Sequence, residues 1–543
     1  MKKFYLLLSL FTALILSANL CFAANIENTS NDELTPESIA AARSSAIIRP
    51  PADSNQFSSA VLKPGSDLNA YVPNFTPYET LLIIPYNIGA NSNYKMTVID
   101  RSAPAQTSAG TAAVSKAQTR AASTETKNTR ISLDKRMRET EKMTIKDFAY
   151  NSPARKLTGT VSRKQAAIGD NKDFWCLSSI SNWPPAKTDY KQIHSKLLSI
   201  GEHCYIYEDQ ETPEGYQKLT AEDVAAIQKE FDTVVYPKIT NAFGSEPNPG
   251  IDNDPKLHIL FTWNINQLGF SGYFDSINQL TQKSLEYYNN NDKEHYYISN
   301  EKELITMNAP ANDFNGPFFR QYSTGILAHE FQHMISYNMR SKNNIMEETW
   351  LSEGLAQVAQ DIAGYGYQYG VASSVVVPFF KKFGPYSLLD HDSSSESYGY
   401  DYLFARYLID RGAVPKNLVI TDKLGRENVA CELKSKKIAD DFDSFYVEFL
   451  TTLGISNKNL KNSDPYNFKS INIEAKQPDG TVLKGITPTC EFASIPFSYA
   501  ENKLREYGFN VLKCETALQY APEIKFEVPK NSGIGVIILR IRK

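Results

Sequence analysis

The apolar residues near both ends of the chain follow the patterns of β-strands. A short apolar run at residues 81–85 is followed, after turn residues, by alternation over 94–99, and the run 534–539 is rich in β-branched residues. Such runs and alternations are typical of sheet strands. We therefore predict an N-terminal β domain over 59–180 and a C-terminal β domain over 461–543.

The N-terminal β domain is interrupted by a stretch of different composition. Residues 102–130 are rich in Ala, Ser and Thr and almost lack large apolar side chains. A segment that cannot bury apolar surface does not offset the entropy lost on ordering. We expect a disordered insertion there.

The middle of the chain, residues 181–460, changes from mixed to helical patterning. Apolar runs at 204–207 and 257–261 predict buried strands, and residues 220–236 repeat apolar side chains at helical spacing behind Thr220, a suitable N-cap. From about 317 to 410 the pattern is helical. The order of elements predicts an α+β domain.

The first residues resemble a secretory signal. Two lysines precede an apolar run and then small residues, so residues 1–23 are expected to be cleaved near Ala23, and residues 24–58 to form a flexible N-terminus or a pro-segment. The alternative is a lipid on Cys21, but Leu20 is bulky where lipoprotein signals carry a small residue. No later segment approaches the ~20 apolar residues of a membrane span. We expect an exported protein, in the periplasm, at the cell surface or secreted, with no transmembrane anchor.

Composition and cysteines add limited information. The 543 residues carry a net charge of −4, which gives no support to nucleic-acid binding. Five cysteines follow the signal, and in an oxidising compartment Cys176 with Cys204 and Cys490 with Cys514 are candidate disulfides, with Cys431 left over. The alternative is that all five are thiols.

Candidate chemistry is concentrated at one helical segment. His329 and His333 are four residues apart and Glu330 directly follows the first of them. Positions i and i+4 share a helix face, so two imidazoles can bind one metal ion while the glutamate handles a proton. The apolar residues of the segment form a separate stripe, which indicates that the histidines face a cleft or solvent and not the core.

A third ligand is expected twenty residues later. Glu353 lies in a second helical segment, after Asn343 and Asn344, which can make the turn, and beside Gly354, which would let two helices approach closely. A catalytic zinc site needs three protein ligands and an open position for water. Spacing and neighbours favour Glu353 over Glu347 and Glu348.

These two segments, His329-Glu330-Phe331-Gln332-His333 and Trp350-Leu351-Ser352-Glu353-Gly354-Leu355-Ala356, resemble the gluzincin metallopeptidases, and most closely the hyicolysin-like neutral zinc peptidases. The resemblance covers about residues 165–450. It implies a gluzincin-type domain in which His329, His333 and Glu353 bind one Zn²⁺, Glu330 is the general base, and the substrate is a protein or peptide. Gln357 stands where thermolysin-like relatives carry an aspartate, which leaves open how His329 is held.

Two further features concern the substrate. By similarity to gluzincin aminopeptidases we choose Tyr398 as the oxyanion donor, with Tyr400 second; both can instead be packing residues, and His391 has less weight because a lone loop histidine is usually exposed. From position alone, residues 303–308 are expected to be the edge strand along which a substrate lies.

The sequence therefore predicts an exported zinc endopeptidase. An aminopeptidase is the first alternative, although Ile345-Met346-Glu347-Glu348 only superficially resembles the amine anchor of that class. A non-enzymatic surface-binding protein with a protease-like domain is the second, and Glu330 argues against it because a binding module has no use for a base.

Overall fold

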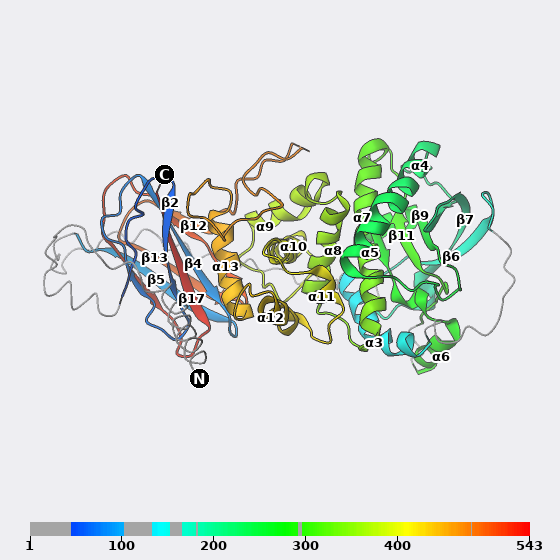
Figure 1. Cartoon of the computed structure of the whole chain (residues 1–543), viewed down its shortest axis with the longest axis horizontal. Coiled ribbons are helices and arrows are strands. Elements are labelled where there is room, and N and C mark those ends of the chain that lie inside the picture. The colour runs from blue at the N-terminus through cyan, green and yellow to red at the C-terminus, as the bar shows by residue number, and fades with distance from the viewer. Residues whose placement is uncertain are drawn as a thin grey trace, which may run out of the picture. The chain divides into compact units, whose positions relative to one another are not determined.

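The computed structural model describes residues 45–102, 133–151, 166–180, 183–291, 296–478 and 480–542 (Figure 1). The chain is a mixed α and β protein, and the described strands form three sheets. The predicted signal peptide, residues 24–44 and residues 103–130 of the predicted insertion lie outside these residues. The expectation of a flexible N-terminus over 24–58 is wrong for its last part, because strands β1 (Ala46–Ile47) and β2 (Gln56–Leu62) begin there. Within the described ranges, no helix combines the length and the apolar character that crossing a membrane requires.

Strands from the two ends of the chain pair with one another. One sheet has the order β1-β3-β16-β5-β13, and the other has the order β12-β15-β4-β17-β2 with β14 also paired to β4. The strands are β1 (Ala46–Ile47), β2 (Gln56–Leu62), β3 (Asn69–Tyr71), β4 (Glu79–Asn87), β5 (Ser92–Asp100), β12 (Cys490–Phe492), β13 (Phe497–Leu504), β14 (Gly508–Phe509), β15 (Leu512–Cys514), β16 (Pro522–Glu527) and β17 (Ile534–Arg542).

The expectation of two separate β domains is therefore wrong. Strand β4 lies antiparallel to β17, with Ile83 opposite Ile538. Buried side chains from both sheets form one apolar cluster, as in a β-sandwich. Each terminal segment supplies only part of each sheet, and the pairing between segments 450 residues apart leaves no signal in the local pattern.

The apolar run in β4 is buried on both faces. Ile83 belongs to the sandwich cluster, whereas its neighbours Leu82 and Ile84 belong to the central cluster of the helical region. Helix α13 (Phe442–Ile455) packs against β17 on that side (Figure 1). This second layer explains why β4 is a continuous apolar strand and not an alternating one.

The central sheet has the order β10-β11-β9-β8-β7-β6. Its strands are β6 (Asn171–Leu177), β7 (Tyr190–Ile200), β8 (Cys204–Asp209), β9 (Leu257–Thr262), β10 (Gly272–Phe274) and β11 (Leu304–Asn308). Strand β6 was expected in the N-terminal β domain, but it pairs with β7. The expected edge strand, β11, lies between β10 and β9, so β10 is the edge strand at that end.

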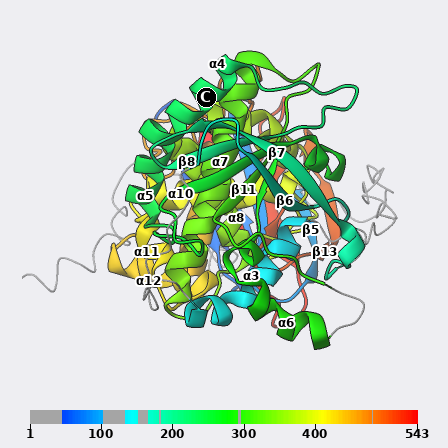
Figure 2. The same cartoon turned by 90° about the vertical axis from the view of Figure 1, so that its right-hand side faces the viewer.

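Helices pack against this sheet and against one another. They include α4 (Ala221–Glu230), which Thr220 caps as expected and which continues through a π-turn into α5 (Tyr236–Phe243). Helix α7 (Gly316–Ser341) contacts β10 and β11 (Figure 2), and α8 (Thr349–Ala363) packs between α7 and α10 (Ser395–Asp410) (Figure 1). The others are α6 (Gln282–Asn291), α9 (Val377–Lys381), α11 (Pro415–Val419) and α12 (Gly425–Ser435).

One helix comes from the segment expected to be β structure. Helix α3 (Leu133–Asn151) contacts α7 and buries Ile145 and Phe148 in the central core. Residues 59–180 therefore contribute strands to two sheets and a helix to the central region, and do not form one β domain.

The predicted disulfides are absent. All five cysteines of the described residues are free, and Cys431 is exposed. Cys176 in β6 is opposite Lys191 at the start of β7, whereas Cys204 in β8 lies beside Ile200 at the end of β7, so the two cysteines are on the order of 30 Å apart and beyond the reach of a disulfide. Cys490 is opposite Leu512 in the register of β12 and β15, and Cys514 is opposite Phe492.

Candidate metal centre

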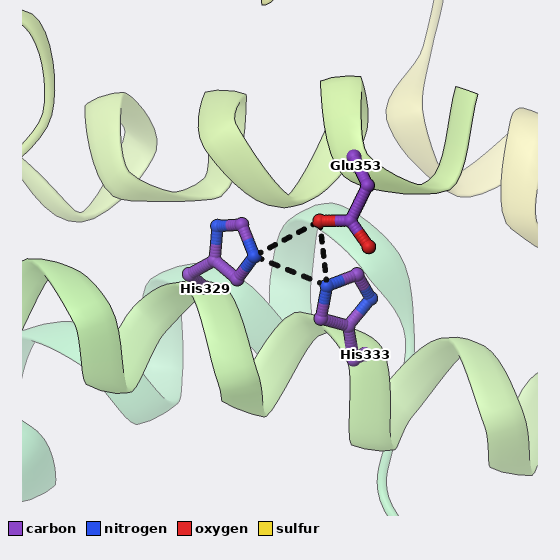
Figure 3. Close-up of side chains that lie close together, drawn as sticks. All are labelled: His329, His333 and Glu353. Carbon is purple, nitrogen blue, oxygen red and sulfur yellow. Dashed lines mark hydrogen bonds and ion pairs between the residues drawn. The ribbon is translucent and has the colours of Figure 1, made fainter. Parts of the chain in front are cut away.

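Helix α7 carries both histidines one turn apart on one face. The Nε2 atoms of His329 and His333 lie 3.1 Å apart. Both side chains are buried, and they point toward the neighbouring helix α8 (Figure 3). The predicted i, i+4 arrangement is confirmed as geometry.

Glu353 extends from α8 toward this pair. Its Oε2 atom is 3.3 Å from Nε2 of His329 and 3.4 Å from Nε2 of His333 (Figure 3). For bonds of about 2.0–2.1 Å to a tetrahedral zinc ion, the corners of the tetrahedron are roughly 3.3 Å apart. The three atoms therefore have the mutual spacing of three zinc ligands.

The hydrogen bonding of Glu353 supports the same interpretation. The side chain is 1% exposed, and both carboxylate oxygens are buried without a hydrogen-bond partner in the described part of the chain. Burial raises the pKa of this carboxyl, but the two histidines and Arg138 outweigh burial and hold the pKa well below its usual value. Burying a carboxylate whose oxygens accept no hydrogen bond is unfavourable in free energy unless a cation binds it. His329, His333 and Glu353 therefore fit a zinc ion.

Glu330 lies beside the three candidate ligands without joining them. Its Oε2 atom accepts a hydrogen bond of 2.9 Å from the backbone N–H of Phe274 in β10. Burial raises the pKa of Glu330 to about 7, against the opposing effect of His329. A carboxyl with a pKa near neutrality is suited to take and return a proton.

A cavity of about 280 Å³ opens at this point. His329 and Glu330 line it, together with Gly272 of the edge strand and Tyr322 of α7. A Cβ atom on Gly272 would lie 2.7 Å from Ile326, so glycine lets the edge strand approach α7 closely. The prediction that the histidine face borders a cleft is confirmed for His329, whereas His333 is not among the lining residues.

Side chains of α8 contact the Nδ1 atoms of both histidines, the ring nitrogens that do not take part in the candidate metal site. Ser352 Oγ is 3.4 Å from Nδ1 of His333, and the amide of Gln360 is 3.4 Å from Nδ1 of His329 and donates to Gln357 at 2.7 Å. An amide can present oxygen or nitrogen after a flip, so Gln360 can accept from a protonated Nδ1. Gln360, one turn beyond Gln357, therefore takes the place expected for a partner of His329.

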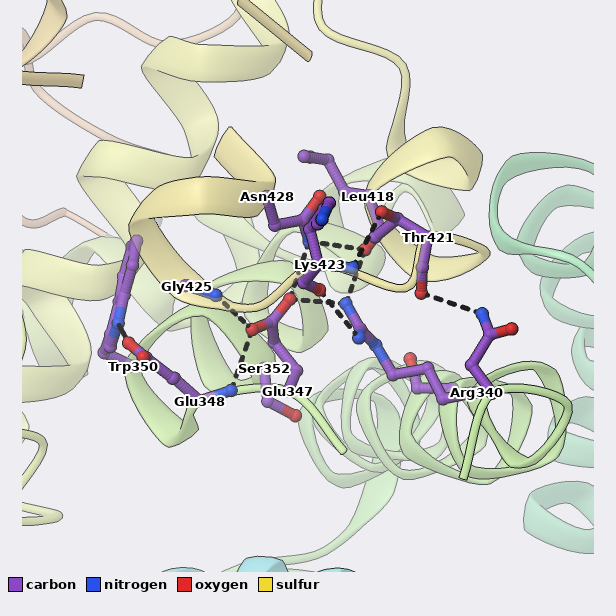
Figure 4. Close-up of polar contacts among 12 residues, drawn as sticks. Arg340, Glu347, Glu348, Trp350, Ser352, Leu418, Thr421, Lys423, Gly425 and Asn428 are labelled. Carbon is purple, nitrogen blue, oxygen red and sulfur yellow. Dashed lines mark hydrogen bonds and ion pairs between the residues drawn. The ribbon is translucent and has the colours of Figure 1, made fainter. Parts of the chain in front are cut away.

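A buried ion pair joins the ends of α7 and α8. Arg340 contacts Glu347 and donates to the carbonyl of Leu418 at 2.8 Å, while Glu347 accepts from the N–H of Gly425 at 2.6 Å and from Asn428 at 2.7 Å (Figure 4). This network fixes the turn between the two helices. Glu347 is thereby excluded as a ligand, which agrees with the choice of Glu353.

Gly354 permits a close approach between two helices, but not between the two that were expected. A Cβ atom at this position would lie 2.7 Å from the carbonyl oxygen of Asp401 in α10. The glycine therefore lets α8 approach α10, and not α7. The turn after α7 is as expected, with Asn344 at a φ of 55°.

Helix α3 brings charged side chains that sequence reasoning missed. Arg138 is buried, with its guanidinium 3.1 Å from Glu141 and 3.9 Å from Glu353. Asp134, one turn earlier, lines the cavity with His329 and Glu330. The spacing of Leu133, Met137, Ile145 and Phe148 is a helical signal that could have revealed this element.

Tyr398, the expected oxyanion donor, lies at the cavity, whereas Tyr400, the second choice, does not. Tyr398 lines the cavity together with Asp134. Tyr400 is fully buried, with its hydroxyl 2.7 Å from that of Tyr446 and 3.0 Å from the carbonyl of Tyr507. Tyr400 is a packing residue.

The expectation that His391 is exposed is wrong. His391 is 4% exposed, its Nδ1 is 2.6 Å from Oδ2 of Asp401, and its ring lies edge-on to Tyr398 with centroids 4.7 Å apart. Burial would lower the pKa of His391, but the hydrogen bond and charge of Asp401 outweigh it and raise the pKa to about 8. The pair forms a support behind Tyr398.

Comparison with known proteins yields distant structural neighbours. No protein-family model and no curated protein matches the chain, so membership of the hyicolysin-like group has no support. Two similar solved structures are of a mutant M1 zinc metallopeptidase from Deinococcus radiodurans, one of them bound to a Tyr-Ser-Ala substrate.

The similarity to these structures is low. The sequences are 11% and 12% identical, the alignments cover 52% and 51% of this chain and 61% and 51% of those chains, and the TM-scores are 0.27 and 0.25. This chain thus spans less than two thirds of the length of either neighbour. Function follows from the geometry of the site alone.

Proposed function

We propose that the protein is a zinc metallopeptidase that hydrolyses peptide bonds in protein or peptide substrates. The observation that carries the proposal is the convergence of one atom each from His329, His333 and Glu353 at 3.1–3.4 Å, beside a cavity that leaves room for a substrate. In this proposal the three residues bind one zinc ion. When bound, zinc lowers the pKa of a water ligand and polarises a carbonyl group.

Glu330 and Tyr398 supply the remaining chemistry of the proposal. Glu330 accepts the proton of the attacking water at its carboxylate and returns it to the leaving amine. Its hydrogen bond from Phe274 N–H ties the base to the edge strand β10. Tyr398, which lines the same cavity, is the proposed donor to the oxyanion that develops on the carbonyl.

We propose endopeptidase activity, with β10 as the strand that pairs with the substrate backbone. As the edge strand of the central sheet, β10 is paired with another strand on one side only, which suits β-augmentation by an extended substrate. Glu347 is enclosed by Arg340, Gly425 and Asn428 and is not available to hold a substrate amine.

Aminopeptidase activity is the second candidate, and one observation favours it. Asp134 places a carboxylate in the cavity next to His329 and Glu330. A carboxylate close to the reacting carbonyl is suited to bind a free α-ammonium group.

Export of the protein is also proposed, from the signal-like residues 1–23. N-terminal sequencing of the mature protein from its native host is the test. A mature chain that begins near Asn25 supports export, and an intact Met1 contradicts it.

Substitution of Glu330 by glutamine tests the activity. The Glu330→Gln protein should retain zinc and lose peptidase activity by at least 10²-fold, while the exposed Glu202→Gln control should match the wild type. If zinc-loaded wild type and Glu330→Gln digest proteins and peptides equally poorly, the peptidase proposal fails and the binding-protein alternative gains.

A further inference from the structure

The described side chains that line the catalytic cavity include two carboxyl groups. Among the described residues that line it, Asp134 and Glu330 carry carboxylates, and no lysine or arginine is present. The nearby cation Arg138 is 3% exposed in its side chain and is engaged with Glu141 and Glu353. A substrate that enters this cavity therefore meets two acidic groups and no basic side chain among these lining residues.

Only one of the two carboxylates has an evident role in hydrolysis. Glu330 is adjacent to the candidate zinc ligands and bound by the edge strand, as a base requires. Asp134 belongs to a different helix, α3, and is not among the three residues whose ligand atoms converge. A half-buried acidic side chain at this point needs another explanation.

The local environment of Asp134 suits a ligand with positive charge. Its carboxyl group lines the cavity and is half-buried, so a cation of a substrate that enters can reach it. A carboxylate has about four acceptor positions and can accept several N–H donors from one cation.

We propose that Asp134 forms a subsite for a positively charged group of the peptide substrate, next to the bond that is cleaved. The inference rests on the proposed peptidase function and specifies its substrate class. The cation is either the α-ammonium group of a free N-terminus or the side chain of a lysine or arginine, since both offer N–H donors and positive charge to a carboxylate. No lysine or arginine is among the described lining residues that could pair with an acidic side chain of the substrate.

A purely structural role for Asp134 makes a different prediction. If Asp134 only orients Tyr398, its loss lowers kcat for every substrate by the same factor. If Asp134 binds the substrate cation, its loss raises KM for cationic substrates and leaves neutral ones nearly unchanged.

The test compares four fluorogenic peptides with one cleavage sequence. One has a free N-terminus directly before the labelled bond, and the second is its acetylated counterpart. The third and fourth are acetylated and carry either lysine or uncharged norleucine beside the bond. Each is assayed with the zinc-loaded wild type, Asp134→Asn and the exposed control Glu139→Gln on the same helix.

We expect the wild type to prefer at least one cationic peptide over its neutral partner by roughly 10- to 100-fold in kcat/KM, as for a hydrogen bond to a charged group. Asp134→Asn should abolish this preference through KM, and Glu139→Gln should retain it. If the free and acetylated peptides differ, the cation is the α-ammonium group. If the lysine and norleucine peptides differ, the cation is the side chain. Melting temperature and zinc content verify that each variant is folded and loaded.

Binding to the inactive Glu330→Gln protein provides a second readout that does not require turnover. The cationic peptides should bind more tightly than their neutral partners, and adding Asp134→Asn should remove the difference. Cleavage without any charge preference, or an equal loss on all four peptides in Asp134→Asn, would overturn the subsite while leaving the peptidase intact. Failure of the wild type to cleave any peptide would instead overturn the peptidase proposal, and the subsite with it.

Discussion

Nε of Arg138 lies 3.9 Å from Oε1 of Glu353, although the two residues are more than two hundred positions apart in the chain. Arg138 and Glu141, both on α3, are buried with Glu353 beside the candidate metal centre. The helix from the N-terminal segment thus forms part of the wall of the site. It supplies a fixed positive charge next to a carboxylate that would otherwise be buried among other acidic groups.

Loss of Arg138 should destabilise the protein. In Arg138→Met, Glu141 remains buried without its partner at 3.1 Å, and breaking a buried pair from one side costs about 3–5 kcal/mol. When the metal-free proteins are unfolded in urea and followed by a probe on α3, the midpoint of the variant should lie below that of the wild type. The double variant Arg138→Met/Glu141→Leu should recover much of the loss because no unpaired charge remains between these two positions. A single variant as stable as the wild type would show that the pair contributes nothing.

Gln360 should affect the metal centre without being a ligand. Its amide lies 3.4 Å from Nδ1 of His329, and removing such a partner typically weakens metal binding or activity by 10–100-fold. Gln360→Leu should therefore release zinc to a competing chelator at lower chelator concentrations than the wild type. The exposed substitution Gln368→Leu serves as the control, and equal zinc affinity of Gln360→Leu and the wild type would contradict the role of Gln360.

The His391–Asp401 pair should make stability depend on pH. Folding raises the pKa of both groups. Burial lowers the pKa of His391, but Asp401 outweighs burial and raises it to about 8, and burial raises the pKa of Asp401 to about 7. The folded protein therefore binds more protons than the unfolded chain in this range, and stability is lost as the pH rises through about 7 and 8.

Unfolding of the wild type and of His391→Gln/Asp401→Asn between pH 6 and pH 9 measures this contribution. The wild type should lose more stability over this range than the double variant, which keeps a hydrogen-bonding pair without the titratable groups. Parallel pH profiles for the two proteins would rule out the linkage.

The candidate ligands could be predicted from the sequence because their arrangement is largely local. His329 and His333 lie one turn apart on a single helix, and a single turn brings Glu353 back toward them. Helix geometry therefore carries most of the information, and Arg340 with Glu347 fixes the turn. The edge strand was misassigned, because the order β10-β11-β9 depends on pairing between strands and not on composition.

The long-range parts could not be predicted in this way. Nothing in the pattern of β4 indicates that β17, at the other end of the chain, pairs with it along its length. Similarly, Asp134 and Arg138 reach the site only through the packing of α3 against α7, so their chemistry was invisible without the fold. Tyr398 was chosen from a resemblance and lies at the cavity, but its role as an oxyanion donor stays a prediction.

Metal analysis of purified protein tests the central claim most directly. Wild type and Glu353→Ala are purified identically, confirmed to be folded, and analysed for zinc by mass spectrometry. We predict one zinc ion per chain in the wild type and its loss in Glu353→Ala, because the convergence of two imidazoles and one carboxylate is what binds the ion. A wild type that binds no zinc, or a Glu353→Ala protein that retains the full amount, would contradict the account.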